Sequence, residues 1–387
     1  MYLSREEELL LAGEKGETLR KAMEILVAIG EIYGADRLIP IGSVQVAGVS
    51  FKNIGQAGLE WISDLKGRAV VPSFLNPAGM DLRRWKEMGI DPDFARDQEM
   101  VVEAYRRLGI SDDCTCIPYQ VRPGVAAKGD HLAWSESSAV SYANSVLGAR
   151  TNREGGPTAL ASALLGRTPL CGYHLDENRR PTHMVVVEQE LRGSDYGALG
   201  FLAGRIVKDG VPLFRLRDKP TLDELKALGA SMAASGSVAL YYVDGATPSP
   251  PSGEPEEKLS FDRTDIEEVR EDHPAEDADM VALGCPHCSP AELFRIADLL
   301  DAKLVRRELW ICTARKIAQA SPDVVKRIEK SGARVICDTC MVVCPASECY
   351  RKIAVNSGKA LAYIPGLVRV QAGFGSTEEC IEVATKG

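Results

Sequence analysis

The last third of the chain alternates between short apolar runs and longer segments with helical periodicity, and this alternation restricts the fold more than any other feature. A strand–helix–strand–helix–strand order predicts a parallel sheet, because parallel neighbours are joined by right-handed helical crossovers. The strands are expected at 279–284, 308–312 and 334–337, and the helices at 290–300 and 314–331.

The preceding part of the chain also mixes helices and strands, so the whole molecule is expected to be α/β. Ser4 and Glu7 have capping-box spacing, which predicts a helix start at the N-terminus. Strands are more prominent between 182 and 244, where runs such as 184–187 are rich in β-branched residues. Strands are expected at 38–41, 69–71, 184–187 and 237–243, and helices up to 34 and at 53–65, 82–88, 95–108, 136–147, 196–207 and 221–234.

A segment rich in proline, glycine and serine interrupts this pattern at 245–255. Its prolines keep the backbone extended and remove amide donors, which favours a linker over a packed element. A chain of 387 residues also exceeds the roughly 250–300 residues at which single cores stop growing. We therefore expect an N-terminal α/β region at 1–244, divisible into two subdomains with a strand-rich part near 182–244, a linker at 245–258 and a C-terminal α/β domain at 259–387.

Eleven cysteines are present, and seven of them lie between Cys285 and Cys349. Their odd number and low density indicate a reducing compartment and not a disulfide-rich domain. Two CxxC pairs, at 285–288 and 337–340, directly follow predicted strands. The carboxyl ends of parallel strands meet at one edge of a sheet, so both pairs are expected there, with the cysteines of 114–116 facing them across a cleft.

Three kinds of site fit these thiols. Buried free cysteines pack as small hydrophobic side chains. Two CxxC pairs also match the ligands of a structural zinc ion, but 48 residues separate Cys288 from Cys337, against about 15–20 in ribbon-type sites. An iron–sulfur cluster is the third, since the run from Cys337 to Pro345 resembles part of a bacterial ferredoxin motif. The solitary cysteines, for which packing is the simplest role, are Cys171, Cys312 and Cys380.

Charge and hydropathy exclude other classes of protein. The net charge of −9 argues against a nucleic-acid binder that depends on phosphate contacts, while a small anionic ligand stays compatible with a locally positive pocket. The chain contains no run of about 18 apolar residues and no signal-peptide pattern at its N-terminus. We expect no membrane span and a cytoplasmic location.

Several short loops combine glycine with serine or asparagine. Backbone N–H groups in such loops bind anions, although most glycine-containing loops are ordinary turns. The segment 137–153 has small polar residues at helical spacing and ends in a turn whose arginines suit carboxylate or phosphate recognition. His131 and His287 lie near the candidate site, although a structural role is the more common one for a single histidine. The loops are 47–50, 76–79 and 356–359.

Several longer stretches of the sequence, taken together, resemble the aconitase X family. The similarity runs over essentially the whole chain, and the string 142–156 makes it specific. The resemblance implies an aconitase-like multidomain fold with parallel sheets and a cluster site in an interdomain cleft. The stretches that carry it are Pro72–Met80, Cys114–Tyr119, His131–Ser138, Tyr142–Gly156, Gly284–His287 and Asp338–Val343.

Members of this family are iron–sulfur dehydratases, so the resemblance implies a hydro-lyase. The family's cluster positions match Cys116, Cys285 and Cys340. Three protein thiolates on a 4Fe–4S cluster leave one iron open to act as a Lewis acid. Further cysteines leave open which thiol of each pair binds, although the family match favours the first three. These further cysteines are Cys114, Cys288, Cys337 and Cys344.

The same resemblance implies a small anionic substrate. In archaeal two-subunit members, (R)-5-phosphomevalonate is dehydrated to trans-anhydromevalonate 5-phosphate, a step of an archaeal-type mevalonate pathway to isoprenoids. Bacterial relatives dehydrate cis-3-hydroxy-L-proline, which is the alternative. The substrate-binding positions match Gly48, Val49, Ser50, Asn76, Pro77, Glu136, Ser137, Ser357 and Gly358, with Arg153 and Glu154 as additional candidates.

The chain ends too early for the swivelling small domain that fused members carry, so the resemblance implies a large subunit. A separate small subunit would then complete a heterodimer or a higher assembly. In aconitase-type mechanisms a serine of the mobile domain removes the proton, so the base is expected on the partner and none is assigned here. The cysteine spacing alone also allows a non-catalytic electron-transfer protein or a zinc-stabilised binding protein.

Overall fold

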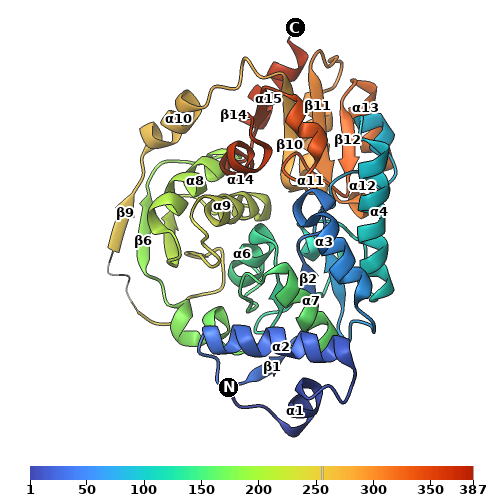
Figure 1. The fold of residues 1–387 in the computed structure, drawn as a ribbon. Helices are drawn as coiled ribbons and strands as arrows, with labels where there is room; N and C mark the ends of the chain where they lie inside the picture. Colours follow the sequence, from blue (N-terminus) through green and yellow to red (C-terminus); the bar gives the residue numbers. More distant parts are fainter. Residues whose placement is uncertain (254, 256, 387) are drawn as a thin grey trace.

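The C-terminal part forms the parallel sheet that its sequence predicts. This computed structural model describes residues 1–253, 255 and 257–386. The sheet has five parallel strands in the order β12-β11-β10-β13-β14 and lies at the top of Figure 1. The elements are β10 (Met280–Cys288), α11 (Pro290–Leu299), β11 (Glu308–Thr313), α12 (Arg315–Ala320), α13 (Pro322–Lys330), β12 (Arg334–Cys337), β13 (Lys352–Val355), α14 (Gly358–Tyr363), β14 (Gln371–Phe374) and α15 (Thr377–Thr385).

Two details of this part differ from the sequence prediction. The single helix expected at 314–331 is broken at Ser321, because Pro322 cannot continue the hydrogen bonding of α12 and instead begins α13. The strand expected at 279–284 continues as β10 to Cys288, so Cys285 lies within the strand and not just past it. Its register with β11 is irregular between Leu283 and Cys288. The cysteine motif thus lies at the carboxyl end of β10, next to the end of β11.

Gly284 makes this irregularity possible. Its φ is +96°, and a Cβ there would stand 2.1 Å from the carbonyl oxygen of Cys312. Any side chain would therefore push β10 away from β11 just before Cys285.

The first part of the chain surrounds a small parallel sheet of order β3-β2-β4. The strand expected at 69–71 is wrong: Val70 is 65% exposed, and the strand lies at 73–75 instead. The N–H groups of Ala69 and Val70 bond to Leu108 and Ala163 outside the sheet. The elements are α1 (Arg5–Leu11), α2 (Glu17–Ile32), β1 (Leu38–Pro40), β2 (Val44–Val46), α3 (Phe51–Asp64), β3 (Ser73–Leu75), η1 (Trp85–Met88), α4 (Pro92–Arg107), α5 (Pro118–Val121), β4 (Ala133–Trp134), α6 (Ser137–Ser145), α7 (Gly156–Leu165) and β5 (Arg167–Pro169).

The middle part contains a third parallel sheet, of order β8-β7-β6-β9. The strand expected at 237–243 is reduced to its last two residues, whereas both predicted helices are confirmed as α8 and α9. These helices approach closely, since a Cβ at Gly200 would lie 2.5 Å from the carbonyl oxygen of Leu228. The elements are β6 (His183–Val187), α8 (Asp195–Val207), β7 (Pro212–Leu216), α9 (Leu222–Ser235), β8 (Tyr242–Val243), β9 (Glu257–Ser260) and α10 (Arg263–Asp272).

The segment predicted as a linker, 245–258, joins β8 to β9. Glu254 and Glu256 of this segment lie outside the described residues. Its last two residues already belong to β9, which pairs in parallel with β6 before the chain proceeds to β10. The chain therefore completes the middle sheet with β9 before it enters the C-terminal sheet at β10. The domain boundaries stay a prediction.

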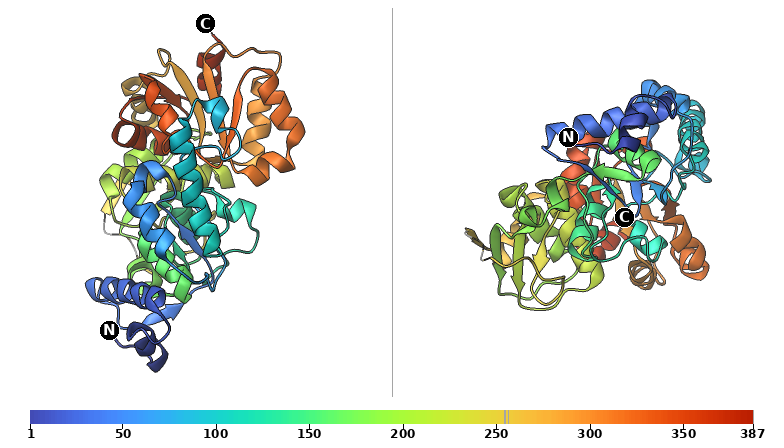
Figure 2. Two further views of the ribbon diagram at one scale, coloured as in Figure 1. Left: turned by 45° about the vertical axis from the view of Figure 1, so that its right-hand side comes forward. Right: turned by 90° about the horizontal axis from the view of Figure 1, so that it is seen from below.

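The three parts pack against one another. One hydrophobic cluster continues from the middle part into the C-terminal sheet and includes Tyr196, Trp310 and Phe374. The left view of Figure 2 shows α1 and α2 at the opposite end of an elongated molecule from the C-terminal sheet. Among the described helices, none combines the length and the apolar character that a bilayer crossing requires.

Candidate active site

Three cysteines from distant segments of the chain lie close together. Cys116 precedes α5, Cys285 lies in β10 and Cys340 follows β12, and each is at most 7% exposed. The interaction between the Cys285 and Cys340 side chains raises the pKa of Cys285 and lowers the pKa of Cys340 to about 7. Burial raises the pKa of Cys116 to about 12, and its charge also acts on Cys285. The structure thus brings the three predicted ligands together.

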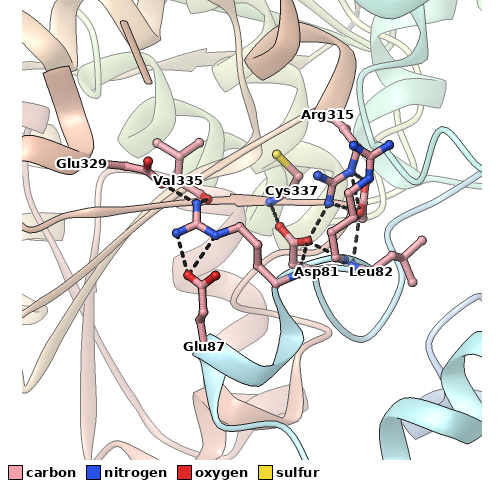
Figure 3. A network of polar contacts seen from close by, with 10 residues as sticks. Asp81, Leu82, Glu87, Arg315, Glu329, Val335 and Cys337 are labelled. Carbon is pink, nitrogen blue, oxygen red and sulfur yellow. Dashed lines mark hydrogen bonds and ion pairs between the residues drawn. The ribbon is translucent and has the colours of Figure 1, made fainter. Parts of the chain in front are cut away.

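The cysteine loop after β12 is held from the first part of the chain by a network around Asp81 (Figure 3). Asp81 is fully buried, and its Oδ2 accepts the backbone N–H of Cys337 at 2.9 Å. Arg315 donates to Asp81 Oδ1 at 2.6 Å and to Asp338 Oδ2 at 3.0 Å. The N–H of Ala78 donates to the Asp338 carbonyl at 2.7 Å. The loop after β3 is therefore tied directly to the loop after β12.

A buried ion pair between Glu136 and Lys359 lies next to the thiols. Glu136 caps α6 by accepting the N–H of Ala139 at 2.8 Å, and Lys359 Nζ donates to Ser138 Oγ at 3.1 Å. Burial opposes both charges. The pKa of Glu136 is nevertheless lowered and that of Lys359 raised, because each group stabilises the charge of the other. The pair therefore places the Lys359 ammonium, whose charge Glu136 balances, beside the cysteines.

Lys359 is the residue of this site that sequence reasoning missed. The family resemblance singles out Ser357 and Gly358 but not the lysine after them, and lysines are mostly exposed. Its partner Glu136 lies 223 residues away, so no local pattern connects the two. The one available signal was its position directly after two predicted substrate-binding residues.

Ser357 and Gly358 start α14 beside β10. Ser357 Oγ donates to the Cys285 carbonyl and accepts the N–H of Ala360. A Cβ at Gly358 would stand 2.3 Å from the carbonyl oxygen of Gly197, so only glycine lets α14 begin this close to α8. Both residues therefore fix the helix that carries Lys359.

The loop after β2 reaches the C-terminal part through Ser50. The Ser50 hydroxyl donates to the Val343 carbonyl at 3.1 Å. The carbonyl of Val49 accepts from Gln98 Nε2 at 2.9 Å, and Gly48 has a φ of +78° that glycine adopts without strain. The three predicted residues thus form an ordered loop that touches the segment following Cys340.

Asn76 and Pro77 follow β3, directly before Ala78, whose N–H bonds to the loop after β12. The Oδ1 atom of Asn76 is buried and has no hydrogen-bond partner among the described residues. The same holds for Ser135 Oγ and Thr339 Oγ1, which directly precede Glu136 and Cys340. Buried polar atoms are normally hydrogen-bonded, so these three atoms indicate a place for polar groups from outside the chain.

Arg153 and Glu154 face different surroundings. Arg153 Nη2 donates to Tyr363 Oη at 3.2 Å, and Tyr363 Oη donates to Ser137 Oγ at 3.2 Å. This chain of contacts connects Arg153 to the buried ion pair. Glu154 instead accepts from Thr168 Oγ1 at 3.4 Å, and burial raises its pKa to about 7. Both residues line a cavity of about 910 Å³.

A smaller cavity of about 350 Å³ opens beside Cys285 and Ser357. Its volume suits a small ligand, since such pockets start at about 300 Å³. Lys226 lines this cavity but is paired with Glu292, so its charge is balanced within the chain.

The charge of Lys359 distinguishes the predicted ligands from the other cysteines nearby. It favours the thiolate form of Cys116, Cys285 and Cys340, although burial still raises the pKa of Cys116 and the neighbouring Cys340 still raises the pKa of Cys285. The remaining four are all buried, and burial is the largest cause of their raised pKa values. These four are Cys114, Cys288, Cys337 and Cys344.

A single-ion centre finds no support in the part of the chain that the structure describes. No three His, Cys, Asp or Glu side chains there are arranged to hold one metal ion. A cluster presents separate iron atoms to its thiolates, so its ligands surround a larger volume than a zinc ion. The solitary Cys171, Cys312 and Cys380 are buried, as expected for packed thiols.

Comparison with known families supports one relationship along the whole chain. Family models described as the first, second and third domains of aconitase X match residues 1–177, 181–271 and 278–386. A solved structure of Thermococcus kodakaraensis aconitase X in its holo-form superposes with a TM-score of 0.92. It is 44% identical, and the match covers 99% of this chain and 100% of that one.

Two kinds of named relative are similar in sequence. The phosphomevalonate dehydratase large subunit of Methanosarcina mazei is 57% identical, over 100% of this chain and 98% of that protein. That of Methanothermobacter thermautotrophicus is 52% identical, over 97% and 96%. The cis-3-hydroxy-L-proline dehydratase of Pseudomonas aeruginosa is 35% identical, over 98% of this chain but 69% of the relative.

Proposed function

The chain belongs to the aconitase X family, and from this membership we propose that it is the large subunit of a phosphomevalonate dehydratase. The observation that carries the proposal is the end-to-end match to subunits of that name at 46–57% identity. Hydroxyproline dehydratases are less similar and extend well beyond the matched region. The reaction is the elimination of water from (R)-5-phosphomevalonate to give trans-anhydromevalonate 5-phosphate.

Cys116, Cys285 and Cys340 would hold a 4Fe–4S cluster. The fit rests on three buried thiols from three segments, beside a buried cation and unpartnered polar atoms. When three thiolates bind such a cluster, the remaining iron is an open Lewis-acid position for a substrate hydroxyl.

Residues of the chain surround the thiols with polar and charged groups that can bind and orient a substrate. Thiolates concentrate negative charge in a buried place, and Lys359 offsets it from within α14. The unpartnered Asn76 Oδ1 accepts a hydrogen bond from the substrate hydroxyl. The Ser50 and Ser357 hydroxyls fix the loops that surround it. These residues bind and orient the substrate; the base that removes its proton is assigned to the small subunit.

Arg153 is the candidate for binding the substrate phosphate. Among the described residues it forms a hydrogen bond to Tyr363 and no ion pair, so its guanidinium is available to an anion. Arginine binds phosphate oxygens with two parallel N–H donors. Contacts through Tyr363 and Ser137 connect this charge to Glu136 of the buried ion pair.

The proposal is tested by producing the chain anaerobically with its small subunit. We expect the assembled protein to contain iron and sulfide and to eliminate water from (R)-5-phosphomevalonate but not from cis-3-hydroxy-L-proline. Each subunit alone should be inactive. Turnover of hydroxyproline in place of phosphomevalonate would assign the alternative dehydratase. A protein that contains zinc, or that shows a reversible redox couple without turnover, would reject both enzymes.

A further inference from the structure

We infer that His287 is a positioning residue that holds the three candidate cluster cysteines in one arrangement, an inference that rests on the proposed iron–sulfur function. His287 is fully buried in β10, between Cys285 and Cys288. It contacts the Cys116 segment across 171 residues of sequence and the Cys340 segment across 52.

Three hydrogen-bonding groups of His287 each reach a cysteine segment. Its backbone N–H donates to Cys116 Sγ at 3.1 Å. Its Nδ1 lies 3.0 Å from Thr115 Oγ1, in the residue before Cys116. Its Nε2 lies 2.9 Å from the carbonyl oxygen of Thr339, in the residue before Cys340. His287 is itself two residues from Cys285. This one residue, through its backbone and its ring, therefore connects all three segments.

The contacts fix the tautomer of the ring. The Thr339 carbonyl accepts only, so Nε2 carries the proton and donates it. Nδ1 is then an acceptor, and the Thr115 hydroxyl donates to it. Thr115 Oγ1 in turn accepts the N–H of Ile117 at 3.2 Å, which completes its hydrogen bonding. Every polar atom of the His287 ring is therefore used to join the segments.

The backbone of this segment is also fixed from the middle part of the chain. Lys226 Nζ donates to the His287 carbonyl at 3.4 Å and pairs with Glu292 in α11. Groups that orient metal ligands in this way strongly affect metal retention, because a thiol that drifts out of place releases its iron. His287 thus acts on the cysteines and needs no contact with the substrate.

The test compares His287→Ala, His287→Gln and His287→Asn with His174→Gln, a buried histidine whose ring contacts His131. Glutamine carries an amide N–H at about the reach of Nε2 and can keep the Thr339 contact. Asparagine carries a carbonyl oxygen near the position of Nδ1 and can keep the Thr115 contact. Each is therefore expected to rescue one of the two side-chain contacts.

The readouts are iron and sulfide per chain after anaerobic reconstitution, the rate of iron loss to a chelator, and the electron paramagnetic resonance spectrum. Circular dichroism checks that each variant is folded. We expect His287→Ala to lose iron roughly 10–100-fold faster than the unaltered protein. The Gln and Asn variants should lie between, and His174→Gln should match the unaltered protein.

A folded His287→Ala protein with unchanged iron loss and spectrum would overturn the inference. If the alanine variant does not fold, the decision passes to the Gln and Asn variants, and unchanged retention in both would overturn it equally. Iron retention is measured without substrate. A cluster-bearing protein that fails to dehydrate phosphomevalonate would thus refute the proposed substrate alone, whereas an unaltered protein that takes up no iron refutes both.

Discussion

Lys359 and Glu136 form an ion pair in which each side chain is 6% exposed. The pair joins the start of α14 to the start of α6. Charges this deeply buried persist only when paired, because each has lost most of its hydration. The ion pair therefore fixes two helix ends beside the thiols. Substitution of either residue would leave the charge of the other buried without a partner.

The two partners should be strongly coupled in stability. Lys359→Met or Glu136→Gln alone is expected to lower the free energy of unfolding by about 3–5 kcal/mol, because the remaining charge is buried without compensation. The double variant should lose less than the sum of the two. Denaturant titration of all four proteins measures the coupling. Strictly additive losses would mean that the two charges do not depend on each other.

Arg315 is expected to act on the cysteine loop through Asp81 and Asp338. Arg315→Ala leaves two buried carboxylates without their shared cation, at a cost of about 3 kcal/mol in the free energy of unfolding. It should also speed iron loss, since Asp81 holds the Cys337 N–H. Denaturant titration and chelator kinetics report the two effects.

Arg84 offers a matched control in the same network (Figure 3). It pairs with Glu87 and Glu329 and is 35% exposed, so Arg84→Ala should cost about 1 kcal/mol at most and leave iron retention unchanged. Equal effects of the two variants would show that the network supports stability in general and not the cysteine loop.

The sequence predicted best what depends on neighbouring residues. The β-α-β-α-β pattern of 279–337 is local, so the parallel sheet and the convergence of Cys285 with Cys340 follow from strand order alone. Gly284 is a clear exception. A glycine is required there because the carbonyl of Cys312 on β11 leaves no room for a Cβ. The strand at 257–260 also escaped prediction, because its charged residues match an edge strand of a distant sheet and not an apolar run.

The parts of the site that escaped prediction depend on contacts between distant residues. Lys359 becomes a site residue only when α14 meets Glu136, and the Asp81 network forms only when the loops after β3 and β12 touch. His287 was visible as a histidine in a cysteine motif, but its role lies in partners on two other segments. Such roles require the packed structure.

Arg153 should affect substrate affinity more than turnover. Arg153→Ala is expected to raise KM for phosphomevalonate roughly 10–100-fold, because a hydrogen bond to a charged group contributes about 1.5–3 kcal/mol. Because the role proposed for Arg153 is to bind the phosphate and not to take part in the elimination, kcat should change little. Steady-state kinetics of the complex with its small subunit provide both constants.

Arg150, three residues earlier, is the control for charge. It pairs with Asp176 and donates to the His174 carbonyl at 2.9 Å, so its guanidinium is already engaged. Arg150→Ala should leave KM close to that of the unaltered enzyme. A larger KM effect from Arg150 than from Arg153 would place the phosphate elsewhere.

Glu154 should make the stability of the protein depend on pH. Burial raises its pKa from 4.5 to about 7, so the folded protein binds this proton more tightly than the unfolded chain. The resulting stabilisation is fully present below pH 4.5 and is lost as the pH rises to 7. The shift corresponds to ~3 kcal/mol.

Glu154→Gln removes this titration, so its free energy of unfolding relative to the unaltered protein should rise by that amount between pH 4.5 and 8. Glu177→Gln alters an exposed carboxyl on the same cavity and should follow the unaltered protein at every pH. Parallel curves for Glu154→Gln and the unaltered protein in denaturant titrations would show that the buried carboxyl gains compensation elsewhere.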